Sequence, residues 1–107
     1  MHTTWATEVQ QEEGADSAVL IVTGELDIAT APRLRAAVGD LMGQGVRHLE
    51  IDLDACVFID STGMGALLWA AHRLQATGGD LRAAHLHGAP AKALEAAGLD
   101  RVFQVTH

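Results

Sequence analysis

Ser61 is the residue of this chain whose surroundings best suit chemistry. It belongs to the run Phe58-Ile59-Asp60-Ser61-Thr62-Gly63-Met64-Gly65, in which an apolar segment gives way to a polar turn, after which apolar residues recur at helical spacing. A hydroxyl at the start of a helix lies beside unpaired backbone N–H groups and at the positive end of the helix dipole. A phosphate on Ser61 would therefore be tolerated by the fold, and the pattern favours a serine that is phosphorylated and recognised by a partner.

Such a phosphate would act on a partner rather than on the fold. It adds roughly 1.5 to 2 negative charges. Asp60 adjoins it, and Asp27, Asp52 and Asp54 are expected in loops or strand ends around it. Like charge at a contact opposes binding, so the modification could switch a complex off. The alternative is that Asp60 or Ser61 merely caps the helix, and chemistry alone favours that alternative.

An enzymatic role for Ser61 finds little support in the sequence. His72, on the same predicted helix, lies eleven residues away. That separation is about 16 Å along a helix, which is too far for direct proton transfer. The hydrolase motif Gly-x-Ser-x-Gly is absent because residue 59 is Ile. No catalytic residue is therefore predicted, and we do not expect an enzyme.

Cofactor and metal sites are not indicated either. The segment Gly63-Met64-Gly65 lacks the third glycine of a dinucleotide fingerprint, and no phosphate-loop lysine follows it. His85 and His87 are expected on one side of a strand, as are Asp52 and Asp54, but two ligands do not make a metal site. We expect the two histidines at the surface or at a strand end.

The elements that position Ser61 follow from hydrophobic periodicity. Thr30 is expected to cap a helix that has Pro32 in its first turn, and residues 24–29 are expected to form a loop before it. The predicted strands cover about 4–9, 17–23, 46–53, 81–86 and 99–105, and the predicted helices about 30–42, 61–76 and 90–97.

This order of elements predicts an α/β fold. Strands that alternate with helices indicate parallel pairing and right-handed crossovers. Polar residues alternate with Leu49, Ile51 and Leu53, which indicates that helices cover mainly one face, since a sheet covered on both faces would make this strand apolar throughout. We therefore predict a single domain over residues 1–107, with a mixed, mostly parallel sheet of four to five strands and helices mainly on one face.

Composition excludes several classes of function. Fourteen acidic and seven basic residues give a formal charge of −7, which does not suit nucleic-acid binding. Cys56 is the single cysteine, so no intramolecular disulfide forms, and we expect it to be a small packing residue. Residues 1–5 show no signal-peptide pattern, and no apolar stretch approaches the ~20 residues that span a bilayer. We expect a soluble cytoplasmic protein that does not bind membranes.

Two motifs resemble the signatures of the STAS domain of anti-sigma factor antagonists. The first is Thr23-Gly24-Glu25-Leu26-Asp27-Ile28-Ala29-Thr30-Ala31-Pro32 followed by Leu34-Arg35, and the second is Ile51-Asp52-Leu53 followed by the run from Phe58 to Gly65. Gly78-Gly79, and Ala97-Gly98-Leu99 ahead of Val102-Phe103, match the later pattern. The resemblance covers nearly the whole chain in order, with Met64 in place of the commoner Leu.

The resemblance implies a partner-switching role. The unmodified protein would bind an anti-sigma factor that is also a serine kinase, and this binding would free a sigma factor. The kinase would phosphorylate Ser61, a phosphoserine phosphatase would restore it, and Asp27 would be the acidic residue near the phosphorylation site. The implied partner-binding residues are Glu25, Asp27, Asp60, Ser61, Thr62, Gly63, Met64 and Gly65. No cofactor is implied.

Two alternatives stay open at this point. The same fold serves as a non-switching scaffold module in stress-sensing or transporter-associated assemblies, and the fold alone does not decide between these roles. Many family members also continue into a final helix after the position of Val102-Phe103. Its absence would expose apolar surface, so a homodimer is possible.

Overall fold

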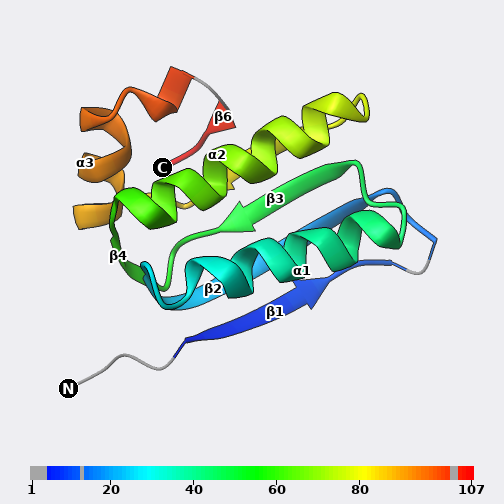
Figure 1. Ribbon diagram of the computed structural model, residues 1–107, viewed down its shortest axis with the longest axis horizontal. Coiled ribbons are helices and arrows are strands. Elements are labelled where there is room, and N and C mark those ends of the chain that lie inside the picture. Colours follow the sequence, from blue (N-terminus) through cyan, green and yellow to red (C-terminus); the bar gives the residue numbers. More distant parts are fainter. Residues whose placement is uncertain (1–4, 13, 102–103) are drawn as a thin grey trace.

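A six-stranded sheet and three helices make up the described part of the chain, residues 5–12, 14–101 and 104–107, in this computed structural model (Figure 1). The elements in chain order are β1 (Ala6–Gln10), β2 (Ser17–Leu26), α1 (Ala31–Gly43), β3 (His48–Asp52), β4 (Cys56–Ile59), α2 (Ser61–Ala76), β5 (Asp80–Ala84), α3 (Gly88–Ala96), the short 3₁₀ helix η1 (Leu99–Arg101) and β6 (Gln104–Val105). Among the described residues, no helix is long and apolar enough to cross a membrane.

The sheet is mixed and mostly parallel. Its strands follow the order β1-β2-β3-β5-β6, and β1 pairs with β2 antiparallel whereas the other pairs are parallel. The remaining strand, β4, pairs with the last residues of β2, beyond the part of β2 that pairs with β3. The predicted fold class is confirmed, with one strand more than the four to five predicted.

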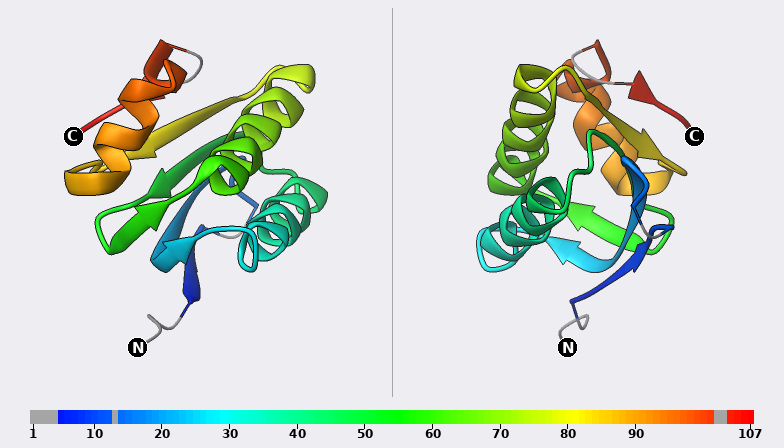
Figure 2. Two further views of the ribbon diagram at one scale, coloured as in Figure 1. Left: turned by 60° about the vertical axis from the view of Figure 1, so that its left-hand side comes forward. Right: turned by 90° about the vertical axis from the view of Figure 1, so that its right-hand side faces the viewer.

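The core lies between the sheet and the two long helices. In β2 every second residue is buried, and Leu20, Val22 and Leu26 are fully so. Leu34 of α1 and Leu67 of α2 are buried in the same core cluster. Figure 2 shows α1 and α2 side by side on one face of the sheet, as the sequence predicted, while α3 packs against β4 near one end of the sheet.

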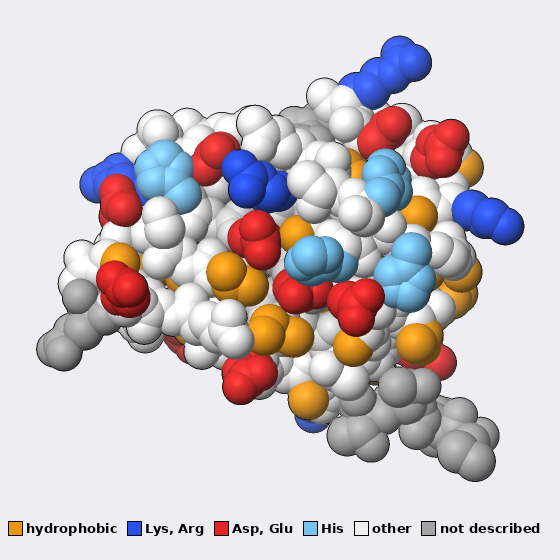
Figure 3. Space-filling model, turned by 180° about the vertical axis from the view of Figure 1, so that it is seen from behind, with side chains coloured by type: hydrophobic (Ala, Val, Ile, Leu, Met, Phe, Trp, Pro, Cys, Tyr) orange, Lys and Arg blue, Asp and Glu red, His pale blue; other side chains and the backbone are white. Residues whose placement is uncertain are grey.

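The other face of the sheet is open to solvent and carries polar side chains with apolar ones among them. Glu50 and Asp52 of β3 alternate with the buried Leu49 and Ile51. Seen from this side, histidines lie beside acidic side chains, with basic side chains interspersed (Figure 3). Alternation in β3 thus correctly predicted which face the helices leave uncovered.

The loop predicted for residues 24–29 is wrong in its first half. Strand β2 continues to Leu26 because Glu25 and Leu26 find partners in β4, opposite Phe58 and Ile59. That pairing is long-range, so local periodicity gave no sign of it. Gly24, at the irregularity between the two halves of β2, has φ of 108°, a value that favours glycine.

Apart from the last predicted strand, the other boundaries differ from prediction by at most two residues. Strand β5 ends at Ala84 rather than at residue 86, and His85 follows it with φ of 58°. The last predicted strand is reduced to Gln104–Val105, preceded by η1. Position 4 of the first predicted strand, position 13 of the turn after it, and Val102 and Phe103 lie outside the described residues.

Candidate functional site

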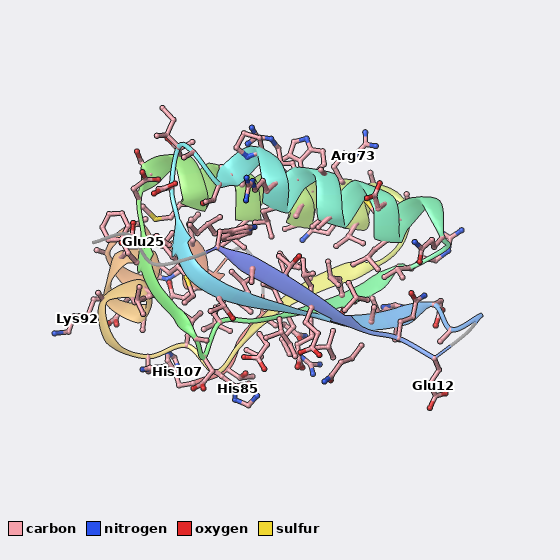
Figure 4. The ribbon with its side chains drawn as sticks, turned by 90° about the horizontal axis from the view of Figure 1, so that it is seen from below. Glu12, Glu25, Arg73, His85, Lys92 and His107 are labelled. Atoms are coloured by element: carbon pink, nitrogen blue, oxygen red, sulfur yellow. The ribbon has the colours of Figure 1, made fainter. Side chains whose placement is uncertain are left out.

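Two loops meet at the end of the sheet where β2 and β4 stop. The backbone N–H of Asp60 donates to the carbonyl oxygen of Leu26 at 3.2 Å, which joins the loop after β4 to the loop after β2. Parallel pairing of the two strands causes this meeting, since both end at the same edge. Figure 4 shows Glu25 at this end of the molecule and Glu12 at the opposite end. The loop that holds Asp27 therefore adjoins Asp60 and the start of α2 at Ser61, although the two segments are far apart in sequence.

Helix α2 begins at Ser61 and is capped by Asp60. The Gly63 N–H donates to Asp60 Oδ1 at 2.8 Å, and Asp60 has the extended backbone typical of an N-cap residue. Ser61 is the first helical residue and is exposed. In the described part of the chain its hydroxyl makes no hydrogen bond with another residue. Asp60, rather than Ser61, therefore caps α2. The cap does not use the Ser61 hydroxyl, which is available for another role.

The loop after β2 is braced by Asp27 and Thr30. Asp27 Oδ1 accepts from the N–H groups of Ala29 at 2.9 Å and Thr30 at 3.1 Å. The Thr30 hydroxyl donates to the Glu25 carbonyl at 2.6 Å and accepts from the Asp27 N–H at 2.9 Å. Thr30 is the N-cap residue of α1, as predicted, but its side chain makes no capping hydrogen bond, because its hydroxyl bonds back toward β2 instead. Pro32 lies in the first turn of α1, as predicted.

The remaining predicted partner-binding residues differ in accessibility. Gly63 is buried, whereas Gly65 is exposed. Thr62 and Met64 are half-buried, and Met64 packs against the core cluster. Glu25 is half-buried, lies in β2 and pairs with Phe58 of β4. The exposed and half-buried members could reach a partner, while Gly63 serves the packing of α2 against β2.

Asp52 and Asp54, expected around Ser61, face histidines instead. Asp52 Oδ2 lies 4.0 Å from His85 Nε2, and Asp54 Oδ1 lies 3.4 Å from His87 Nε2. Both histidines are exposed and follow the end of β5, in agreement with the expected strand-end positions. Across the described residues, no group of three or more His, Cys, Asp or Glu side chains is placed to hold a metal ion.

A groove of about 750 Å³ lies at the other end of the sheet. Its lining includes Ser17, His48 and Asp80, the first residues of β2, β3 and β5. Ser61 follows the last residues of β4, so the groove and the Ser61 region occupy opposite ends of the parallel strands. The groove contains none of the predicted site residues.

Strand β4 contributes features that the sequence did not reveal. The register of its pairing with β2 shifts by one residue. Cys56 pairs with Gly24 and Phe58 pairs with Glu25, so Val57 between them has no partner in β2. Such a bulge redirects side chains, and both Val57 and Phe58 are exposed. An apolar run of four residues predicts burial, and no local signal marks the bulge.

Cys56 itself is buried, as expected for a packing residue. Burial raises the pKa of the Cys56 thiol above its usual value, and hydrogen bonds with the backbone of Phe58 and Leu26 offset part of that rise. A protonated, enclosed thiol is a poor nucleophile. Cys56 therefore supports the packing of β4 rather than chemistry at the site.

The geometry at Ser61 suits modification better than nucleophilic attack. Its hydroxyl is exposed at the amino end of a sixteen-residue helix, where the helix dipole favours negative charge. A nucleophilic serine needs a base within hydrogen-bond reach. Within the described residues no histidine or carboxylate is hydrogen-bonded to the Ser61 hydroxyl, so the site lacks that feature.

Comparisons with known proteins give a consistent result. The model of the STAS domain family matches residues 6–107. The anti-sigma-F factor antagonist RsfB of Mycobacterium tuberculosis is 40% identical over 50 residues, a match that covers 47% of this chain and 41% of RsfB. The match therefore spans less than half the length of that relative.

Solved structures extend the similarity to almost the whole chain. The crystal structure of an anti-sigma factor antagonist from Mycobacterium paratuberculosis matches with a TM-score of 0.84 at 27% identity, covering 96% of this chain and 86% of that one. The Bacillus cell fate determinant SpoIIAA in its phosphorylated form matches with a TM-score of 0.71 at 22% identity, covering 95% of this chain and 92% of that one.

Proposed function

The chain belongs to the STAS domain family, and from this membership and the geometry at Ser61 we propose that it acts as an anti-sigma factor antagonist controlled by phosphorylation. In this proposal the unphosphorylated form binds an anti-sigma factor that is also a serine kinase, which frees a sigma factor. Phosphorylation of Ser61 ends the binding, and a phosphoserine phosphatase restores it. The protein has no catalytic role of its own in this cycle and acts in the cytoplasm, where sigma factors are.

The observation that carries the proposal is the exposed Ser61 hydroxyl at the start of α2. Asp60 supplies the cap at 2.8 Å, so the helix does not need the serine side chain. A phosphate there would lie at the positive end of the helix and leave the core untouched. SpoIIAA, solved in unphosphorylated and phosphorylated forms, matches this chain with TM-scores of 0.72 and 0.71, so that relative keeps the fold in both forms.

The charge around Ser61 explains how a phosphate would switch binding. Asp27 and Asp60 already make the adjoining loops acidic, and the whole chain carries a formal charge of −7. A phosphate would add roughly 1.5 to 2 negative charges to this surface. A partner whose binding surface is complementary to the unmodified Ser61 would then no longer match the charge that it meets. Unfavourable juxtaposition of like charges costs several kcal/mol, enough to dissociate a complex.

Phosphate mapping tests the proposal. The purified chain is incubated with each anti-sigma factor kinase of the source organism and ATP, and the product is analysed by mass spectrometry. We expect one phosphate, on Ser61, and none on the Ser61→Ala variant. Phosphate on another residue would refute the assignment of Ser61. A large homo-oligomer with no affinity for any of the kinases would favour the scaffold-module alternative instead.

A further inference from the structure

Four large apolar side chains are exposed among the described residues, and three of them lie in the two segments that meet beside Ser61. In the described part of the chain these are Val9, Ile28, Val57 and Phe58, which are 47%, 74%, 54% and 44% exposed. Ile28 lies in the braced loop after β2, and the two β4 residues lead into Asp60. Val9, on the edge strand β1, is the one that lies elsewhere. A single exposed apolar residue is ordinary, whereas a group beside a functional residue marks an interaction surface.

Ile28 is presented by a rigid loop. Asp27 Oδ1 accepts hydrogen bonds from the N–H groups of Ala29 and Thr30, the two residues after Ile28, at 2.9 and 3.1 Å. The Thr30 hydroxyl ties the same loop to Glu25 at 2.6 Å. Because the loop is already ordered, little conformational entropy remains to be lost when Ile28 enters a partner's pocket. An apolar side chain held rigidly in water is what a binding anchor requires.

Phe58 is directed outward by the bulge in β4. Its pairing with Glu25 follows the unpaired Val57, so two successive residues of one strand are exposed while Cys56 and Ile59 on either side are buried. Bulges often lie beside functional sites, where they re-aim side chains. The aromatic ring thus lies across the β2–β4 ladder from a carboxylate, three residues before Ser61.

We propose that Ile28 and Phe58 are apolar anchors for the protein partner, and that the partner's binding face is an apolar socket with Lys or Arg opposite Glu25 and Asp27 but not opposite Ser61. This inference rests on the proposed function, so the partner is the anti-sigma factor kinase. Charge complementarity supports these basic groups, because Glu25 pairs with Phe58 and Asp27 adjoins Ile28. A kinase that transfers phosphate to Ser61 would hold the phosphates of its nucleotide opposite that hydroxyl, so a phosphate on Ser61 would meet like charge. Interfaces commonly combine a few buried apolar or aromatic anchors with a polar rim.

The two parts of this surface have separable roles. Contact by Ile28 and Phe58 supplies affinity that depends little on salt, because burial of apolar area does not rely on charge. The carboxylates and Ser61 form a charged rim whose contribution is screened at high ionic strength. Phosphorylation would act on the rim, and the anchors would set the affinity of the unphosphorylated form.

Binding to the same kinases, measured by isothermal titration calorimetry at low and high salt, tests the anchors. Ile28→Ser and Phe58→Ser are compared with wild type and with Val9→Ser, a matched control that removes an exposed apolar side chain from β1. We expect each anchor variant to bind at least about tenfold more weakly at both salt concentrations, and Val9→Ser to stay within about twofold of wild type. Thermal unfolding checks each fold, and Ile28→Ser carries the test if Phe58→Ser is unstable.

The outcomes separate the anchors from the proposed function. If wild type binds a kinase and is phosphorylated on Ser61, but Ile28→Ser binds as tightly as wild type, the anchors are refuted and the proposed function stands. An equal loss of affinity in Val9→Ser would also refute the anchors, because binding would then depend on exposed apolar side chains in general and not on those beside Ser61. If wild type neither binds nor is phosphorylated by any of the kinases, the proposed function fails and the anchors fail with it.

Discussion

Gly63 lies directly against the backbone carbonyl of Leu26, so closely that a Cβ on residue 63 would overlap the Leu26 oxygen. The same carbonyl accepts the Asp60 N–H at 3.2 Å. The first turn of α2 therefore rests on the last residue of β2, and the position of Ser61 relative to Asp27 is set by backbone contact. A side chain between these two segments would separate them.

The first prediction is that Gly63→Ala destabilises the domain. Its new methyl group has no room, so α2 or the end of β2 must move, and we expect a loss of about 1 to 3 kcal/mol in the free energy of unfolding, typical of overpacking. Gly65→Ala is the matched control, because a Cβ there meets no atom within 4 Å. It should be neutral or stabilise by up to about 1 kcal/mol through helix propensity. Urea unfolding of both variants gives the comparison, and equal stabilities would contradict the contact.

The second prediction concerns the cap of α2. Asp60→Ala removes the acceptor for the Gly63 N–H, and we expect a loss of about 1 kcal/mol. Asp60→Asn keeps a side-chain oxygen in the same place, so it should lose much less. Thermal unfolding of the two variants separates the hydrogen bond from the charge. If Asp60→Asn were as unstable as Asp60→Ala, the carboxylate charge at the helix start would be the main contribution instead.

Much of this arrangement was predictable from local sequence. The alternation around Leu49 and Ile51 gave both the strand and its buried face, and the change of period after Ser61 gave the start of α2. These signals are local, because each depends on spacing within one element. Helix coverage of one sheet face followed from the same alternation.

The features that were missed depend on long-range pairing. Residues Gly24 to Leu26 are a strand because β4 lies beside them, and β4 is short and irregular because it bulges at Val57. Nothing in the order of apolar residues distinguishes the exposed Phe58 from the buried Ile59. Ile28 likewise looked like an ordinary part of a loop. Its exposure follows from hydrogen bonds of Asp27 and Thr30 that only the folded turn makes.

The third prediction tests the brace of that turn. Thr30→Val keeps the side-chain volume but removes the hydroxyl that bonds Glu25 and Asp27, so we expect a loss of about 1 to 2 kcal/mol in stability and weaker binding of the kinase through a looser Ile28. Thr77→Val is the control, since the Thr77 hydroxyl donates to the Leu74 carbonyl at 2.9 Å at the other end of α2. It should lower stability without changing affinity. Equal affinity in the two variants would argue against a positioning role for Thr30.

The fourth prediction follows from the buried thiol. Since burial raises the pKa of Cys56, the folded protein holds the thiol proton at a pH where the unfolded chain releases it. Unfolding then releases a proton, so this contribution to stability is present below the pKa of the unfolded thiol, about 8.5, and is lost as pH rises through the folded pKa. Urea unfolding should show a decline above about pH 8.5 that is steeper for wild type than for Cys56→Ala.

Alkylation gives an independent check on Cys56. Iodoacetamide should label the folded protein far more slowly than the urea-unfolded chain, because the thiolate is the reactive form and the sulfur is enclosed. A rate equal to that of the unfolded chain, or identical pH profiles for wild type and Cys56→Ala, would contradict the raised pKa.

The last prediction separates the charge at position 61 from its size. Ser61→Asp places a carboxylate where the phosphate would lie, while Ser61→Asn has nearly the same shape without the charge. Both variants should unfold within about 0.5 kcal/mol of wild type, and the aspartate variant is favoured slightly by the helix dipole. We expect Ser61→Asp to bind the kinase at least about tenfold more weakly than Ser61→Asn at low salt.

Salt dependence then identifies the cause of that difference. Coulombic repulsion between exposed groups is screened over about 8 Å at physiological ionic strength and over about 3 Å at 1 M. The difference in kinase affinity between Ser61→Asp and Ser61→Asn should therefore become smaller as the salt concentration is raised. The loss of kinase affinity in Ile28→Ser should persist at high salt. Equal affinities for the two variants at low salt would show that charge at position 61 does not control docking, and an electrostatic switch would then have no physical basis.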